Sequence, residues 1–382
     1  MKGPDAVVLA RQAQTRGQTA GSRVLVLGLL AFAVLLDGCA QLGPSLVKAG
    51  RNEYNAAVAQ TDDEQIVLNL VRLRYADNTM WLDVNSVTTQ FNFAQGANAE
   101  VQRSDEFSRY GWRIGGDMRY SETPTISYSP VTGEQYVRNR LAPMNFTTFM
   151  VLANAGWAID RLLRLVAGRM NGLDNAPEAE GPTPEDAPDY AQFARAASLL
   201  RELQKKDVLR FRYRDPGKDT RPAMYFKPEA LDWAETRELR TLLGLQVRKR
   251  SYDLHTVADN PLSDSIGIEL RSLNDMAQFL STSVEVPARD EEAGRVTVTK
   301  DQNGQRFDWS RVMDGLFRVR SQPKQPTDAA VAVRYRGAWF YIDDRDMDSK
   351  YTFRLIDQIG AILAGTIEKG PAPVLTLPVG GG

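Results

Sequence analysis

The stretch DAAVAVRYRGAWFYIDD, residues 328–344, carries the clearest signature of the fold. Two runs rich in apolar and β-branched residues, 328–335 and 338–343, stand on either side of Arg336-Gly337. Two such runs separated by a short pair containing Gly are typical of a β-hairpin. The stretch therefore predicts two antiparallel strands that are neighbours in sequence and in space.

Further strands and helices are predicted outward from this hairpin. Apolar residues alternate with arginines over 209–214, which is typical of a strand with one solvated face. Strands are also expected at 246–257 and 265–271, and helices at 229–243 and from Lys350 to Thr366. Ser272 with Asp275 is expected to cap a further helix that ends at about Thr282. Short-range hairpins combined with a few helices indicate an α+β fold with antiparallel sheets and packed helices.

The amino-terminal half has the same mixed character. Thr61-Asp62-Asp63-Glu64 has the form of a capping box, so we expect a helix to start there and to end near Tyr75. Alternating patterns predict strands over 80–95 and 110–128, with Gly115-Gly116 as a turn or bulge in the second. Helices are expected between 132 and 170.

The segment 171–188, NGLDNAPEAEGPTPEDAP, is rich in Pro, acidic residues and Gly and has almost nothing to bury. Such composition predicts a linker. The chain of 382 residues is also longer than the roughly 250–300 residues at which a single core stops growing. We therefore expect two α+β domains, 51–170 and 189–369, followed by a flexible tail, 370–382.

The residue counts exclude several classes of function. The net charge is −1, so the chain has no basic excess for nucleic acid as its main partner. One Cys and one His exclude a zinc site of Cys and His ligands within one chain, and no intramolecular disulfide can form. Phosphate-binding loops of the G-x-x-x-x-G-K-[ST] type are absent from the sequence. We expect no cofactor and no metal.

The first 38 residues predict a secretion signal. Val24 to Leu36 are thirteen apolar residues without a charge, preceded by Arg11, Arg16 and Arg23. A membrane-spanning helix needs about 20 apolar residues, so the run suits the apolar core of a cleaved signal better than an anchor.

The run ends in Leu36-Asp37-Gly38-Cys39, which resembles the lipobox of bacterial lipoproteins. The resemblance implies cleavage between Gly38 and Cys39, a diacylglycerol thioether on Cys39, and a further acyl chain, such as palmitate, on its amino group. Two or more acyl chains hold a protein stably at a bilayer. Residues 39–50 would then be a lipidated tether. Ala40, in the sorting position, implies the periplasmic face of the outer membrane.

Two groups of residues are candidates for a catalytic or a metal-binding role. His255 and Asp253 are expected on one strand face, where a His–Asp pair would orient a general base, but no nucleophile motif accompanies them. Asp344, Asp346 and Asp348 offer oxygen ligands for calcium without completing an EF-hand loop, so helix capping is favoured.

Aromatic residues between Tyr110 and Tyr128, and in Trp339-Phe340-Tyr341, fit either a binding surface or the inner face of a sheet.

The remainder of the chain is similar to uncharacterised bacterial envelope lipoproteins that carry comparable RNEYN, TDDEQ, NLVRLRY and YRGAWFYIDDRD stretches. That resemblance implies a shared fold and no particular activity. The preferred hypothesis is a non-catalytic scaffold or accessory subunit of a cell-envelope assembly, with a membrane and an envelope protein as partners. One alternative is a cell-wall or glycan hydrolase with paired carboxylates. The other is an oligomeric ring or pore component that contributes the strands between 80 and 128 to a shared sheet.

Overall fold

The computed structural model describes residues 42–104, 109–214, 221–256 and 263–365. The chain divides into two compact units, Met1–Asp62 and Asp63–Gly382. The fold class is α+β, with sheets that are mainly antiparallel and helices packed on them, as the sequence predicts. The expected signal peptide, the lipobox and the carboxyl-terminal tail lie outside the described residues.

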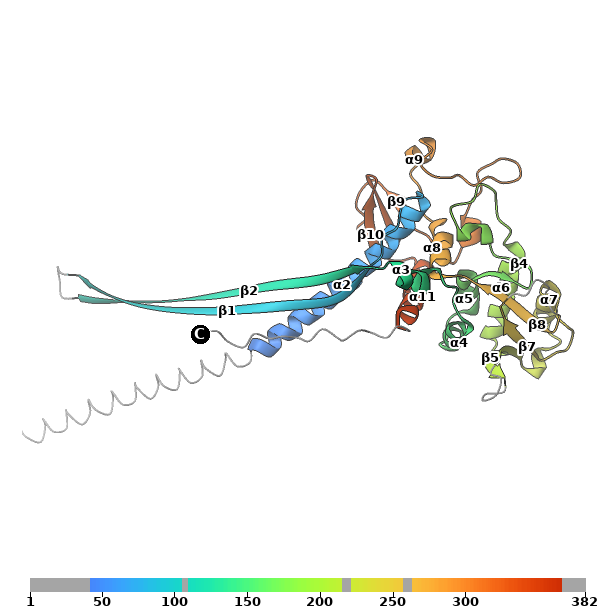
Figure 1. Ribbon diagram of the computed structural model, residues 1–382, viewed down its shortest axis with the longest axis horizontal. Coiled ribbons are helices and arrows are strands. Elements are labelled where there is room, and N and C mark those ends of the chain that lie inside the picture. Colours follow the sequence, from blue (N-terminus) through green and yellow to red (C-terminus); the bar gives the residue numbers. More distant parts are fainter. Residues whose placement is uncertain (1–41, 105–108, 215–220, 257–262, 366–382) are drawn as a thin grey trace, which may run out of the picture. The chain divides into compact units, whose positions relative to one another are not determined.

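The helices and strands follow one another along the whole described chain (Figure 1). The helical elements are α2 (Leu42–Arg74), α3 (Gly133–Tyr136), the π-helix η1 (Val137–Leu141), α4 (Phe146–Asn154), α5 (Ile159–Val166), η2 (Pro177–Glu180), α6 (Ala191–Lys205), η3 (Pro228–Ala230), α7 (Ala234–Leu242), α8 (Leu273–Ser281), α9 (Ala288–Glu292), α10 (Ser310–Met313) and α11 (Met347–Gly365). The strands are β1 (Leu82–Ser104), β2 (Arg109–Pro130), β3 (Ala167–Met170), β4 (Leu173–Asp174), β5 (Leu209–Arg214), β6 (Arg221–Phe226), β7 (Ser251–His255), β8 (Ser265–Leu270), β9 (Arg320–Gln322), β10 (Ala329–Tyr335) and β11 (Ala338–Asp343).

The largest sheet has six strands in the order β4–β3–β8–β7–β6–β5. Neighbouring strands are antiparallel except β7 and β8, which are parallel. Strand β3 pairs with β8 through Arg169 opposite Glu269 and Met170 opposite Ile268. One sheet therefore joins strands from both sides of the boundary that the sequence predicts at 171–188.

The prediction of a linker at 171–188 is wrong, because this polar segment packs into the fold. The segment contains β4 and η2, and Asn175 and Ala179 within it are only 3% and 0% exposed. The Asn175 side chain donates hydrogen bonds to the carbonyls of Arg164 and Ala167 at 2.9 and 2.7 Å. Its polar groups are therefore satisfied by other parts of the protein, so 51–170 and 189–369 are not separate domains.

The predicted hairpin at 328–344 is confirmed. Strands β10 and β11 pair antiparallel, with β9 on the other side of β11. Arg336 and Gly337 have φ angles of 44° and 77°. Positive φ at both central residues is the requirement of a two-residue turn whose twist matches that of the strands. Along β11 buried and half-exposed residues alternate, so one face of this sheet lies on the core.

Strands β1 and β2 form a second, much longer hairpin, also shown in Figure 1. They pair antiparallel from Leu82 opposite Pro130 to Ser104 opposite Arg109. The expected strands at 80–95 and 110–128 are confirmed. Gly115-Gly116 is not a turn, because both residues pair in register inside β2, opposite Asn98 and Ala97. The register shift lies instead between Val84 and Ser86.

Helix α2 begins earlier than the sequence predicts. It starts at Leu42, so the tether expected over 39–50 is helical from that residue onward. Thr61 does not cap a helix start, since it lies inside α2 and its hydroxyl donates to the carbonyl of Val58 at 2.9 Å. A hydroxyl in a helix can bond the preceding turn just as well as it can cap a new one. The predicted end near Tyr75 is confirmed by the last residue, Arg74.

One hydrophobic core runs from the last turns of α2 to α11. Val67, Leu70 and Val71 of α2 are fully buried, as is Ile359 of α11. Helix α8 enters this core behind the capping box that the sequence predicts, in which Ser272 accepts from the Asp275 amide at 3.1 Å and Asp275 accepts from the Ser272 amide at 3.0 Å. This cap fixes the start of α8, and the residues that follow its other end line the site described next.

Candidate functional site

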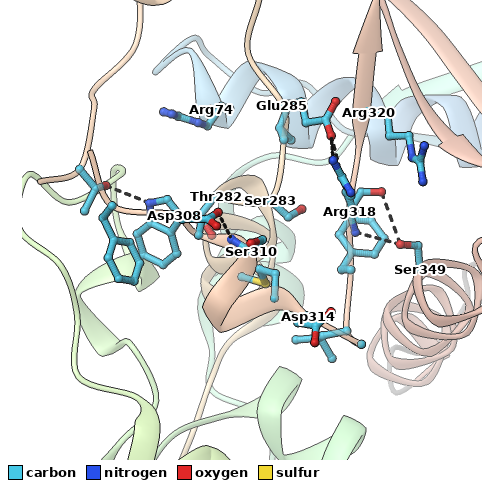
Figure 2. A pocket seen from close by; sticks show the side chains of 18 of the residues that line it. Arg74, Thr282, Ser283, Glu285, Asp308, Ser310, Asp314, Arg318, Arg320 and Ser349 are labelled. Atoms are coloured by element: carbon cyan, nitrogen blue, oxygen red, sulfur yellow. Dashed lines mark hydrogen bonds and ion pairs between the residues drawn. The ribbon is translucent and has the colours of Figure 1, made fainter. Parts of the chain in front are cut away.

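A pocket of about 670 Å³ lies in the unit Asp63–Gly382 (Figure 2). Its walls come from the end of α2, the residues after α8, the loop leading into α10, β9, and the start of α11. Its size is in the range of sites that hold small molecules. The lining is mainly polar, with aromatic side chains between the polar groups, and includes Arg74, Thr282, Glu285, Arg306, Asp308, Trp309, Arg318, Arg320, Asp346 and Ser349.

Arg74 is the most deeply buried charged residue of this lining, with 6% of its surface exposed. Its Nη1 donates to the Thr297 carbonyl at 3.0 Å and to the Thr183 hydroxyl at 3.4 Å. Its Nε is buried with no hydrogen-bond partner. Burial lowers the pKa of the guanidinium, and the nearby Glu291 carboxylate only partly opposes this shift. Arg74 therefore carries a desolvated positive charge.

The other arginines of the pocket differ in how they are compensated. Arg318 donates to Glu285 at 2.6 Å, and Arg306 pairs with Glu291 at 2.7 Å. Arg320 lies 3.8 Å from Asp343, and its Nε is buried without a partner. In Figure 2, Arg74, Glu285 and Arg320 lie along the same side of the pocket.

Most of the lining carboxylates are engaged locally. Asp346 accepts from the amide and the hydroxyl of Ser349 at 3.1 and 2.7 Å, which caps the first turn of α11. Asp348 pairs with Arg161 at 2.5 Å. Asp308 accepts from the Ser310 amide at 2.9 Å, and hydrogen bonding to Ser310 lowers its pKa. The lowered pKa keeps Asp308 ionised at neutral pH.

The hydroxyls of the pocket are also occupied. Thr282 and Ser283 donate to the carbonyls of Phe279 and Leu280 at 2.7 Å, as hydroxyls at a helix end commonly do. Thr299 accepts from the indole of Trp309 at 2.9 Å and donates to the Pro184 carbonyl at 2.7 Å. Among the described residues, the pocket lining includes no His, and the hydroxyl of Ser349, which donates to Asp346, belongs to the cap of α11.

The residues singled out by sequence are dispersed. Leu36, Gly38 and Cys39 lie outside the described residues. His255 is half-buried at the end of β7. The carboxylate of Asp253, which was considered as the partner of His255, forms a salt bridge with Arg214 at 2.9 Å.

Asp344, Asp346 and Asp348 bind Lys350, Ser349 and Arg161 respectively. Across residues 42–365, with the gaps stated above, no group of acidic, His or Cys side chains is placed to hold a metal ion. Phe340 is fully buried and packs edge-on against Tyr75, with ring centroids 6.2 Å apart.

Sequence reasoning missed Arg74, although a signal was present. Val67, Leu70, Val71 and Arg74 fall at the spacing of one helix face, and the first three are apolar. A charged residue on an apolar stripe is expected to be buried, and a buried charge needs a partner or a function. The other lining residues are far apart in sequence, so no local pattern connects them.

No protein-family model, curated protein or solved structure was found to match this chain. Among the described helices, none has both the length and the apolar character needed to cross a bilayer.

Proposed function

We propose that the protein is a lipid-anchored, non-catalytic scaffold or accessory subunit of a cell-envelope assembly, held at the outer membrane on its periplasmic face. The lipobox supports the anchor through Cys39. The observation that carries the scaffold role is the β1–β2 hairpin, whose strands have 23 and 22 residues. At about 3.3 Å per residue each strand extends roughly 70 Å.

A hairpin of this length is expected to pack against the surface of another protein. Within the described residues, β1 and β2 pair with each other and with no third strand, so neither outer edge has a strand partner, although Gln65 binds the backbone of Leu82 at the base of the hairpin. An isolated two-stranded hairpin is at best marginally stable in water, and unpaired edges are templates for further strands. A long hairpin of this kind is therefore well suited to docking on another protein.

The hydrolase alternative has weaker support. It requires two facing carboxylates that are free to exchange protons. In the pocket, Glu285, Asp346 and Asp348 are engaged with Arg318, Ser349 and Arg161.

The proposal is tested by shortening the hairpin. Replacing residues 92–121 with Asn-Gly would join Phe91 to Glu122, which already face each other in the register, through a tight turn. Crosslinking in intact cells followed by pull-down should recover a specific envelope protein with the full chain and lose it with the shortened one. The variant must unfold at the same temperature as the full chain. Equal recovery by both chains would refute the role given to the hairpin.

The anchor is tested separately with Cys39→Ala. The variant should lose lipid labelling and should be released from membranes or remain unprocessed. Unchanged membrane attachment would refute lipidation at Cys39, and it would leave the result of the hairpin experiment unaffected.

A second candidate function, a component of an oligomeric ring or pore, is favoured by the same unpaired edges. In this case the strand that pairs with β1 or β2 comes from another copy of the chain, and closed symmetric assembly is the commonest outcome of self-association. Sedimentation of the full-length protein in detergent should then give one discrete oligomer, which the shortened hairpin abolishes. A monomer at all concentrations would refute this function and leave the scaffold role intact.

A further inference from the structure

The pocket contains a buried cation without a carboxylate counterpart. The carboxylate that acts on Arg74 through its charge, that of Glu291, is paired with Arg306 at 2.7 Å, and the exposed fraction of Arg74 is 6%. A charge removed from water is costly unless it is paired. The two acceptors that it has, the Thr297 carbonyl and the Thr183 hydroxyl, are neutral.

The free donors of Arg74 have a definite geometry. Both hydrogen bonds of Arg74 are made by Nη1, whereas the structure shows none from Nε or Nη2 to any described residue. Nε–H and one Nη2–H point the same way from the guanidinium plane, at the spacing of the two oxygens of a carboxylate. This edge makes paired, charge-assisted hydrogen bonds with a single carboxylate group.

Arg240 shows what a purely structural arginine looks like in the same protein. It is 4% exposed and also has an unpartnered Nε. However, its Nη1 and Nη2 donate to the carbonyls of Leu231 and Lys249 at 2.8 and 2.9 Å, so both ends of its fork are occupied. Arg240 does not line the pocket. Arg74 differs in having one edge free and in lining a cavity.

The charges around Arg74 limit the ligand to one negative group. Arg306 and Glu291 pair at 2.7 Å and offset each other, so Arg74 leaves a net positive charge at this place. Farther along the lining, Asp308 and Asp314 are exposed carboxylates. Arg318 and Arg320 face Glu285 and Asp343, so they offset little further negative charge. Asp308 and Asp314 would repel a second anionic group, whereas the polar lining suits a neutral hydrophilic body.

We propose that this pocket binds a single carboxylate group, carried on a neutral hydrophilic body, through Nε and Nη2 of Arg74. This site is independent of the scaffold role and of the anchor. It assigns a small-molecule ligand class to a protein whose other surfaces indicate protein partners.

The experiment uses D-glucuronate as the probe, with D-glucose as its uncharged match and inorganic phosphate as a different anion. The full chain in detergent is titrated by isothermal calorimetry. Glucuronate should bind saturably, and glucose should bind at least about tenfold more weakly because it lacks the group that Arg74 holds. Equal binding of both sugars, or no binding of either, would overturn the proposal. Binding of phosphate in preference to glucuronate would overturn the carboxylate assignment.

Two variants act in opposite directions. Arg74→Lys keeps a charge but cannot present two parallel donors, so glucuronate should bind roughly tenfold more weakly. Glu291→Gln removes the carboxylate nearest to the site and leaves Arg306 uncompensated, so glucuronate should bind more tightly. The matched control is Arg240→Lys, which alters a buried arginine away from the pocket and should leave affinity unchanged.

Since Arg74 also joins α2 to Thr297, its variant is checked by thermal unfolding. If Arg74→Lys does not fold, the Glu291→Gln result decides, because unchanged or weaker binding in that variant contradicts the proposal.

Discussion

Arg271 should be the most costly single charge to remove from this protein. It is 1% exposed, pairs with Glu180 at 3.0 Å, and donates to the carbonyls of Arg164, Leu165 and Asn175 at 3.1, 3.3 and 2.5 Å. Its guanidinium also lies 3.9 Å from the centre of the Phe279 ring. Burial lowers the pKa of Arg271 to about 10.

The variant Arg271→Met fills much of the same volume and removes the charge. Breaking a buried ion pair by deleting one partner costs about 3–5 kcal/mol. Since the Glu180 side chain is 23% exposed and keeps some hydration, the lower end, about 3 kcal/mol, is expected at pH 7. Urea unfolding followed by circular dichroism measures this as a lower midpoint with an unchanged slope.

The pH dependence of that loss separates charge from packing. Burial raises the pKa of Glu180 above its ordinary value of 4.5, and Arg271 opposes the shift. Without Arg271 the pKa of Glu180 rises further. The folded variant therefore loses least stability when Glu180 is protonated, because no unpaired charge is then buried. The difference in free energy of unfolding between the two proteins should therefore shrink as the pH falls from 7 towards 4.5. A loss that is below about 1 kcal/mol, or that does not vary with pH, would refute the reasoning.

The matched control is Arg195→Met. Arg195 pairs with Glu238 at 2.6 Å, which is shorter than the 3.0 Å of the buried pair, but both side chains are exposed to solvent. Exposed pairs contribute little. Little change in stability is therefore expected at any pH.

Three further predictions concern stability and share the same unfolding assay. Gly168→Ala should cost about 1–3 kcal/mol, because the added Cβ would lie 2.0 Å from the Glu180 carboxylate oxygen, which Arg271 holds in place; an unchanged midpoint would show that Glu180 can move aside. Asp290→Asn should cost about 1.5–3 kcal/mol at pH 7, because the fully buried carboxylate accepts from Tyr75 at 2.7 Å. Burial alone would raise the pKa of Asp290, but its hydrogen bonds hold the pKa below 3.8, so this stabilisation is lost as the pH falls below that value; a loss already complete at pH 6 would contradict the assignment. Gly337→Ala should destabilise the β10–β11 hairpin by about 1 kcal/mol, since φ is 77° there, whereas Ala in place of a glycine with ordinary φ would not; an equal or higher midpoint would refute the turn geometry.

Local sequence patterns predicted the helices and strands of this fold better than the long-range contacts between them. The β10–β11 hairpin and the capping box of α8 were predicted correctly, because each depends on residues a few positions apart. The linker at 171–188 was wrongly predicted, because its polar residues find partners far along the chain, as Glu180 does in Arg271. Composition alone cannot distinguish a polar segment that binds water from one that binds the protein.

The pocket was not predictable in the same way. Its walls come from segments between residues 74 and 349, and only the fold brings them together. Arg74 gave the single local indication, as a charge on an apolar helix face. The residues that do attract notice in the sequence have structural partners: Asp346 caps α11, Asp344 and Asp348 form ion pairs with Lys350 and Arg161, and His255 ends a strand.

The pairing of β3 with β8 has a consequence for how this protein is made. Arg169 on β3 contacts Glu269 on β8, one hundred positions later. A chain that emerges amino end first from a ribosome presents β3 long before its neighbouring strand exists. Until residue 270 is free, β3 has no neighbour on that side and the sheet cannot be completed, although α5 and α6 can already pack on each other. Long-range pairing of this kind slows folding and prolongs exposure to aggregation. The chain is therefore exposed to aggregation during its own synthesis, and truncations that end before β8 should not yield a folded amino-terminal half.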